Sequence, residues 1–130
     1  MKNSYDSERR QSQRFGIQIP VRLSIPDSGD DTHLEARSIN ICMNGLYCTV
    51  NRYVPTFDKF LITFISNEHY EIPAHVISQI EGVVVRVEPE QEEVMRKAYN
   101  IALFFQELSG QQQNALHSLL SSHAEIASAT

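Results

Sequence analysis

Apolar and polar residues alternate along much of the chain after residue 15. The first run carries branched aliphatic side chains at every second position: Ile17, Ile19, Val21, Leu23 and Ile25. Alternation with a period of two predicts a strand with one buried face. Pro20 belongs to the outward-facing set and has no N–H to donate, so we expect an unpaired stretch of the strand there.

Other alternating or continuously apolar runs predict further strands over residues 33–41, 46–50, 59–66, 72–87 and 99–105. Within one of these runs, Val83, Val85 and Val87 are expected to share a face. Gly82 marks either a bulge in that run or a turn between two shorter strands, which gives six or seven strands in total.

Short polar or glycine-containing segments separate these runs. Residues 43–45 predict a tight turn, with a positive φ angle at Asn44 or Gly45. We expect a hairpin-like break at 67–68 and a connection over 89–97 that has room for a helical turn.

The chain changes character near its C-terminus. Leu116, Leu119 and Leu120 recur at helical spacing, and Ser109 is a suitable N-terminal cap. We expect the residues after Ser121, which are mostly small or polar, to fray. Many short strands followed by one helix indicate a mostly β fold, an antiparallel barrel or sandwich with the helix against one end or side.

Charge is unevenly distributed along the sequence. The 130 residues carry a formal net charge of −5, which argues against general binding of DNA or other nucleic acid. Residues 1–14, by contrast, hold four basic side chains against two acidic ones and lack branched aliphatic residues. We therefore expect a flexible basic arm, which suits one compact anion better than a long polyanion.

Signatures of targeting, catalysis and metal binding are missing from the sequence. No apolar run reaches the roughly 20 residues of a membrane span, and the first residues do not form a secretory signal. Cys42 and Cys48 do not form a CxxC pair and no spacing suits zinc, so both are expected to be reduced thiols. Catalytic and phosphate-loop motifs are lacking as well. The sequence predicts a cytoplasmic protein without a membrane span, catalytic residues, metal site or cofactor.

Three arginines stand close together in the arm: Arg9, Arg10 and Arg14. A guanidinium group presents a planar fork that binds phosphate oxygens through paired hydrogen bonds and stacks on aromatic bases. The cluster is either a group that binds phosphate and base or an ordinary solvated face.

A second candidate segment runs from Asn40 to Gly45, where a predicted strand ends in a glycine turn. Asn40 has a short polar side chain that can read a base edge by hydrogen bonding. Gly45 permits close approach of a ligand to the backbone. Taken alone, the segment has the features of an ordinary hairpin turn.

Together the two segments resemble the binding signature of the PilZ family, RxxxR followed by [D/N]xSxxG. The first reads Arg10-Gln11-Ser12-Gln13-Arg14, and the second reads Asn40-Ile41-Cys42-Met43-Asn44-Gly45. The strand pattern that follows is also similar, so the resemblance covers nearly all of residues 8–122.

This resemblance implies a six-stranded antiparallel β-barrel with a C-terminal helix and no enzymatic activity. PilZ domains bind cyclic di-GMP on the outer barrel surface, so Arg10 and Arg14 would hold phosphates and guanine. Asn40 through Gly45 would contact the other guanine region. Binding would order the arm and present a new surface to a protein partner.

On this basis the chain divides into a flexible arm (1–14), a barrel with its helix (15–122) and a frayed tail (123–130). The alternative function is that of a PilZ-like adaptor, which binds a protein partner independently of nucleotide. Retention of both motif arginines, Asn40 and Gly45 favours a cyclic di-GMP receptor.

Two positions refine the expected binding. Cys42 occupies the serine position of the motif and is a weak hydrogen-bond donor, so we expect weakened binding and not its loss. Arg9 precedes the first motif arginine, where arginine in PilZ-like proteins goes with a stacked pair of ligands. The resemblance thus implies two cyclic di-GMP molecules per chain.

Overall fold

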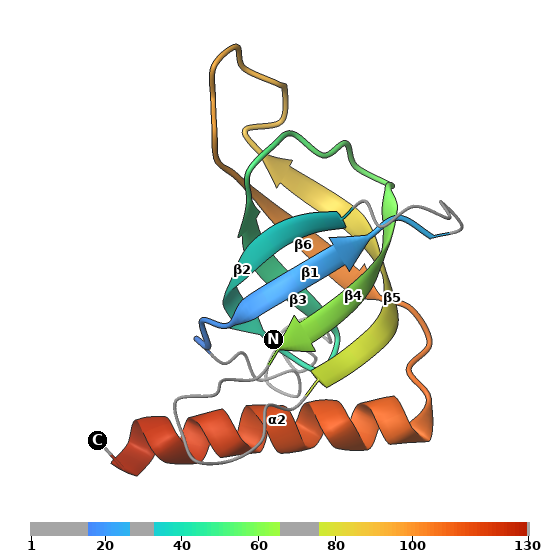
Figure 1. Ribbon diagram of the computed structural model, residues 1–130, viewed down its shortest axis with the longest axis vertical. Coiled ribbons are helices and arrows are strands. Elements are labelled where there is room, and N and C mark those ends of the chain that lie inside the picture. The colour runs from blue at the N-terminus through green and yellow to red at the C-terminus, as the bar shows by residue number, and fades with distance from the viewer. Residues whose placement is uncertain (1–15, 27–32, 66–75, 130) are drawn as a thin grey trace, which may run out of the picture.

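The computed structural model describes residues 16–26, 33–65 and 76–129, and they form a barrel with one long helix (Figure 1). The strands are β1 (Pro20–Ser24), β2 (His33–Ile41), β3 (Gly45–Val50), β4 (Lys59–Ile65), β5 (Val76–Glu88) and β6 (Tyr99–Phe105). The helix is α2 (Gly110–Ala129).

The six strands close into a barrel in the order β1-β2-β3-β6-β5-β4, and every neighbouring pair is antiparallel. The mostly β fold predicted from the sequence is confirmed, and the barrel that the PilZ resemblance implied is observed. The predicted arm (1–14) and the predicted break at 67–68 lie outside the described residues.

Alternate side chains fill the barrel interior, as a period of two requires. Fully buried positions come from all six strands and include Val21, Ile41, Cys48, Phe64, Ile80 and Ile101. Phe64 and Phe105 meet edge to face, with ring centroids 5.9 Å apart. Ser38 is the one buried polar residue in the described part of the chain.

Helix α2 lies across one end of the barrel and covers it (Figure 1). The predicted leucine stripe is confirmed, because Leu116, Leu119 and Leu120 are all buried. Ser109 caps the helix: its hydroxyl accepts from the N–H of Gln112 at 3.1 Å, and its own N–H donates to the Gln112 side chain at 3.0 Å. The helical backbone continues to Ala129, through most of the segment expected to fray.

The prediction for residues 83–87 is wrong in its alternation. Val84 and Val87 are buried, whereas Val85 is 53% exposed. The β5–β6 register shifts between Val84 and Arg86, so an extra residue bulges outward at this point. Gly82 is not a turn, because β5 runs through it, and a Cβ there would collide with the Ile62 side chain.

Three further local expectations need correction. The first strand is shorter than predicted: Ile17 and Ile19 are buried but precede β1, while Ile25 is 42% exposed. Neither Asn44 nor Gly45 has a positive φ angle. The connection over 89–98 contains a turn at 94–95 and no helix.

The unpaired stretch expected at Pro20 is found on the side of β1 that faces β4. Pairing of β1 with β2 includes Pro20, opposite Arg37, whereas pairing with β4 begins only at Val21. The proline therefore sits at the first position of the strand, where a missing N–H is tolerated.

Candidate functional site

The motif segment that begins at Asn40 lies at the end of β2 and forms the turn into β3. Asn40 is half-buried and stands opposite Tyr47 in the β2–β3 register. Cys42 is also half-buried, and its N–H donates to the carbonyl oxygen of Gly45 at 3.0 Å, which closes the turn. The structure thus brings Asn40, Cys42 and Gly45 together in one hairpin connection.

Gly45 is required for a reason that the sequence did not show. It pairs with Phe104 of β6, and a Cβ at position 45 would collide with the carbonyl oxygen of Leu103. The N–H of Phe105 donates to the carbonyl oxygen of Asn44 at 2.8 Å. The turn is therefore pressed against β6, and the glycine permits that approach between two backbones.

Tyr47 and Arg86 lie on the same outer face as Asn40, and sequence reasoning missed both. The register aligns Asn40 with Tyr47, Tyr47 with Ala102, and Ala102 with Arg86, across four strands. The Arg86 guanidinium carbon lies 5.6 Å from the Tyr47 ring centroid. The sequence does show a tyrosine, Tyr47, two residues after the motif glycine. It does not show that Arg86 lies beside this tyrosine, because that depends on the order of the strands in the barrel.

Glu88 holds the Tyr47 hydroxyl group, which donates a hydrogen bond to its carboxylate. This hydrogen bond and partial burial raise the pKa of Tyr47 above its ordinary value. The same carboxylate lies 3.7 Å from the Arg86 guanidinium. Tyr47 therefore stays protonated at neutral pH, and the three side chains form an exposed platform of ring and guanidinium.

Ser38 lies on β2, two residues before Asn40, and is hydrogen-bonded to the segment that precedes β1. Its hydroxyl accepts from the N–H of Ile19 at 2.9 Å and donates to the carbonyl oxygen of Ile17. Its own N–H donates to the carbonyl oxygen of Ile19 at 3.1 Å. The segment that follows the predicted arm is thus tied to the motif strand, while Arg9, Arg10 and Arg14 themselves lie outside the described residues.

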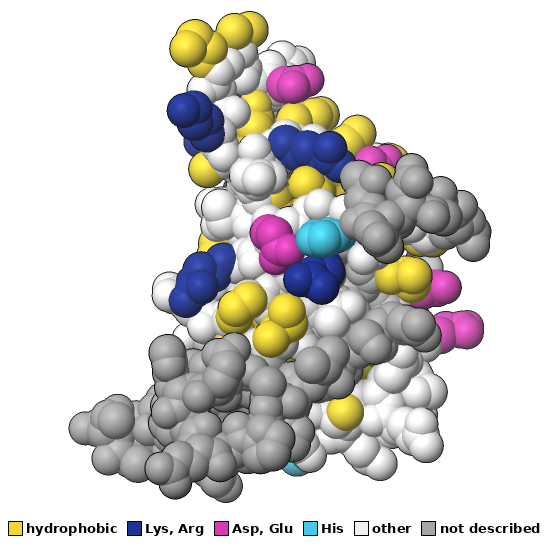
Figure 2. Space-filling model, in the orientation of Figure 1, with side chains coloured by type: hydrophobic (Ala, Val, Ile, Leu, Met, Phe, Trp, Pro, Cys, Tyr) yellow, Lys and Arg dark blue, Asp and Glu magenta, His cyan; other side chains and the backbone are white. Residues whose placement is uncertain are grey.

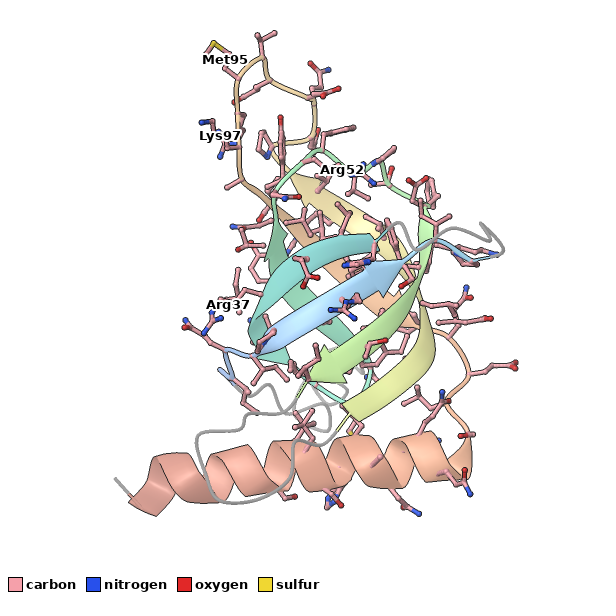
Figure 3. The ribbon with its side chains drawn as sticks, in the orientation of Figure 1. Arg37, Arg52, Met95 and Lys97 are labelled. Atoms are coloured by element: carbon pink, nitrogen blue, oxygen red, sulfur yellow. The ribbon has the colours of Figure 1, made fainter. Side chains whose placement is uncertain are left out.

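An open groove of about 580 Å³ runs beside the motif strand, and its lining includes Gln18, Arg37, Ile39, Thr49 and Lys97. Arg37 and Lys97 lie along the same side of the molecule (Figure 3). Neither cation forms an ion pair with another described residue. Figure 2 shows basic side chains spaced apart on this view and not gathered into one patch.

The two cysteines differ in accessibility. Cys48 is fully buried on β3, and burial raises the pKa of its thiol to about 12, so it stays protonated. Cys42 is only half-buried in the motif turn. In the described part of the chain, no group of His, Cys, Asp or Glu side chains is arranged to hold a metal ion. The helix that the structure describes lacks the apolar length needed to cross a bilayer.

The fold of this chain is similar, over nearly its whole length, to that of a protein of known structure. The solved structure titled "Structure of Bacillus subtilis Inhibitor of motility (MotI/DgrA)" matches with a TM-score of 0.63 at 17% sequence identity. The match covers 92% of this chain and 51% of that one, so this chain spans about half of its length. A search of curated proteins found no match.

The family comparison agrees with the order of motifs and strands described above. The model of the PilZ domain matches residues 8–122, which include the arm arginines, the Asn40–Gly45 turn, all six strands and most of α2. We conclude that this chain belongs to the PilZ domain family.

Proposed function

We propose that this protein is a cytoplasmic bacterial receptor for cyclic di-GMP that acts by binding and not by catalysis. The observation that carries the proposal is the position of the second motif. Within a PilZ-family chain, Asn40 at the end of β2 and Cys42 in the turn to β3 are both partly exposed. A tyrosine–arginine platform lies on the same outer face.

Arg10 and Arg14 bind the phosphates and a guanine of the ligand, through charge-assisted hydrogen bonds and stacking. Asn40 reads the other guanine region, and Tyr47 offers a ring face on which a base can stack. Arg37 and Lys97, both without ion-pair partners among the described residues, add positive charge that attracts the anion.

Ligand binding orders the arm against the barrel and changes the surface that a protein partner meets. Ser38 supports this step because it fixes Ile17 and Ile19, the residues that follow the arm. Slower amide exchange of residues 5–14 on addition of ligand is the expected sign of ordering. Equal exchange with and without ligand would contradict the switch but not the binding.

Two ligand molecules bind as a stacked pair, with Arg9 as the third guanidinium. Two cyclic dinucleotides bring four phosphate charges into a small volume, and an added cation offsets part of their repulsion. Cys42 replaces the hydroxyl of the motif serine with a weaker donor, which lowers affinity by the value of about one neutral hydrogen bond, roughly 0.5–1.5 kcal/mol.

The decisive experiment is calorimetric titration of the purified chain with cyclic di-GMP, with GTP and cyclic AMP as controls. Saturable binding of cyclic di-GMP alone supports the receptor. If none of the three binds, the second candidate, a nucleotide-independent adaptor, takes its place. The substitution at Cys42 is the specific observation that favours this second candidate.

A further inference from the structure

The loop between β5 and β6, residues 89–98, projects beyond the end of the barrel that α2 does not cover (Figure 1). At its tip, Val94 is 94% exposed and Met95 is 87% exposed, more than any other large apolar residue in the described part of the chain. Figure 3 shows Met95 at the extremity of the molecule. Two adjacent apolar side chains this exposed are a candidate for a contact with another molecule.

The loop is braced into one shape. The Arg96 guanidinium donates to the Glu93 carboxylate at 3.0 Å. The Tyr99 hydroxyl accepts from the N–H of Glu93 at 2.9 Å, and the Tyr53 hydroxyl donates to the carbonyl oxygen of Glu90 at 3.0 Å. Because the tip is already ordered, little conformational freedom remains to be lost when it binds.

A pocket of about 490 Å³ opens at the same end of the barrel. Its lining includes apolar Ile25, Val54 and Phe60 and charged Arg52, Asp58 and Lys59. The pocket lies where β1 ends and β4 begins, and the strand registers place these termini at the end from which the β5–β6 loop projects. The apolar tip and the pocket therefore lie at the same end of the barrel.

Charges beside the two features are complementary. The loop has three glutamates, and one of them, Glu93, is paired with Arg96. The other two, Glu90 and Glu92, named here the loop glutamates, form no ion pair with a described residue. Arg52 and Lys59, the pocket cations, likewise form none, and they outnumber the one pocket carboxylate, Asp58. These opposite charges remain unpaired within one chain although they lie at the same end of it.

We infer that two copies of this chain associate end to end, with Val94 and Met95 of each copy inserted into the pocket of the other. A twofold axis makes the two contacts equivalent, as in most homodimers. The loop glutamates of one copy then face the pocket cations of its partner, which sets the register of the pair. The dimer uses the barrel end remote from α2.

Sedimentation velocity of the full chain, in reducing buffer to exclude Cys42 disulfides, tests the association. The contact is small, so we expect a dissociation constant on the order of micromolar to millimolar. Sedimentation should therefore rise from monomer to dimer between about 10 µM and about 1 mM protein. The exposed substitutions Val94→Ser and Met95→Ser, made together, should weaken association at least tenfold without altering the unfolding midpoint.

Reversing the charges of the pocket and of the loop in two separate variants gives the sharper test. A pocket variant carries Arg52→Glu and Lys59→Glu, and a loop variant carries Glu90→Lys and Glu92→Lys. Each alone brings like charges together at both contacts and should remain monomeric. An equimolar mixture restores opposite charges at both contacts and should form heterodimers. The matched control, Glu81→Lys with Glu107→Lys, changes exposed charges nearer the helix end and should associate as the wild type does.

A wild type that stays monomeric throughout this range overturns the inference, and leaves the tip and pocket to some other protein. The inference is also overturned if an equimolar mixture of the pocket variant and the loop variant stays monomeric. It is overturned as well if the pocket variant alone or the loop variant alone dimerises as the wild type does.

Discussion

The hydroxyl of Ser38 accepts a hydrogen bond at 2.9 Å from the N–H of Ile19, a residue nineteen positions away, within the buried wall of the barrel. It also donates to the carbonyl oxygen of Ile17. One small side chain thus satisfies two backbone groups of the segment that enters the barrel before β1.

Replacement of Ser38 by alanine should therefore destabilise the protein by about 1–3 kcal/mol, because a buried N–H and a buried carbonyl lose their partner. Urea unfolding measures the change. Ser24→Ala on β1 is the control, since the Ser24 side chain has no hydrogen bond to another described residue, and its effect should stay within about 0.5 kcal/mol. Equal effects of the two substitutions would remove the role assigned to Ser38.

Arg10→Ala and Arg14→Ala should each weaken cyclic di-GMP binding by roughly tenfold to a hundredfold, the value of one charge-assisted hydrogen bond. The melting temperature should change little, since residues 1–14 lack branched aliphatic side chains and we expect the arm to lie outside the core. Arg22→Ala serves as the control, because Arg22 is exposed on β1 and engages Glu35 at 3.4 Å. Wild-type affinity in both arm variants would show that the ligand binds elsewhere.

Arg9 sets the number of ligands bound in our proposal. Titration at protein concentrations well above the dissociation constant should saturate at two cyclic di-GMP molecules per chain in the wild type. Arg9→Leu should saturate at one, because the remaining cations no longer offset the repulsion of four phosphates. Saturation of the wild type at one equivalent refutes the stacked pair and leaves the receptor intact.

Cys42→Ser should keep or tighten cyclic di-GMP binding, because it restores a hydroxyl at similar volume in a half-buried turn. Cys48→Ser is the matched comparison: that side chain is fully buried in the core, so a hydroxyl there should lower the melting temperature. Calorimetry and melting curves on both variants separate the two roles. A lower melting temperature for Cys42→Ser at unchanged affinity would make Cys42 a packing residue only.

Gly45→Ala should lower stability by about 1–3 kcal/mol, because the added methyl group forces β3 away from the carbonyl oxygen of Leu103. Gly16→Ala is the control, since a Cβ at position 16 meets nothing within 4 Å. Chemical unfolding compares the two. A neutral Gly45→Ala would mean that the hairpin relaxes readily, and the glycine would then matter only for ligand approach.

The strands were predictable from the sequence wherever pairing is regular. Alternation and helical spacing are local properties, so the sequence predicts the strand observed as β2 (His33–Ile41) and the leucines that face the barrel from α2. The bulge at Val85 could not be predicted from the sequence, because an extra residue in β5 is defined only against its partner strand β6. The neighbourhood of Tyr47 and Arg86 was missed for the same reason: β3 and β5 become near neighbours only through β6.

The motif residues themselves could be named from the sequence, but their surroundings could not. The sequence accounts for Gly45 by turn geometry and ligand approach, whereas the structure places it against the backbone of β6, a strand more than fifty residues further along the chain. A contact of that kind follows from strand order and has no local sequence pattern.

Closure of the barrel also limits how this protein can be recognised. Each of the six described strands has a paired neighbour on both sides, from β1 through to β4. Among the described strands a partner therefore finds no strand with a wholly unpaired edge to which it could add one of its own, the mode in which backbone hydrogen bonds supply much of the affinity. Recognition must read side chains and loop tips, so single surface substitutions should separate one partner from another while the barrel stays intact.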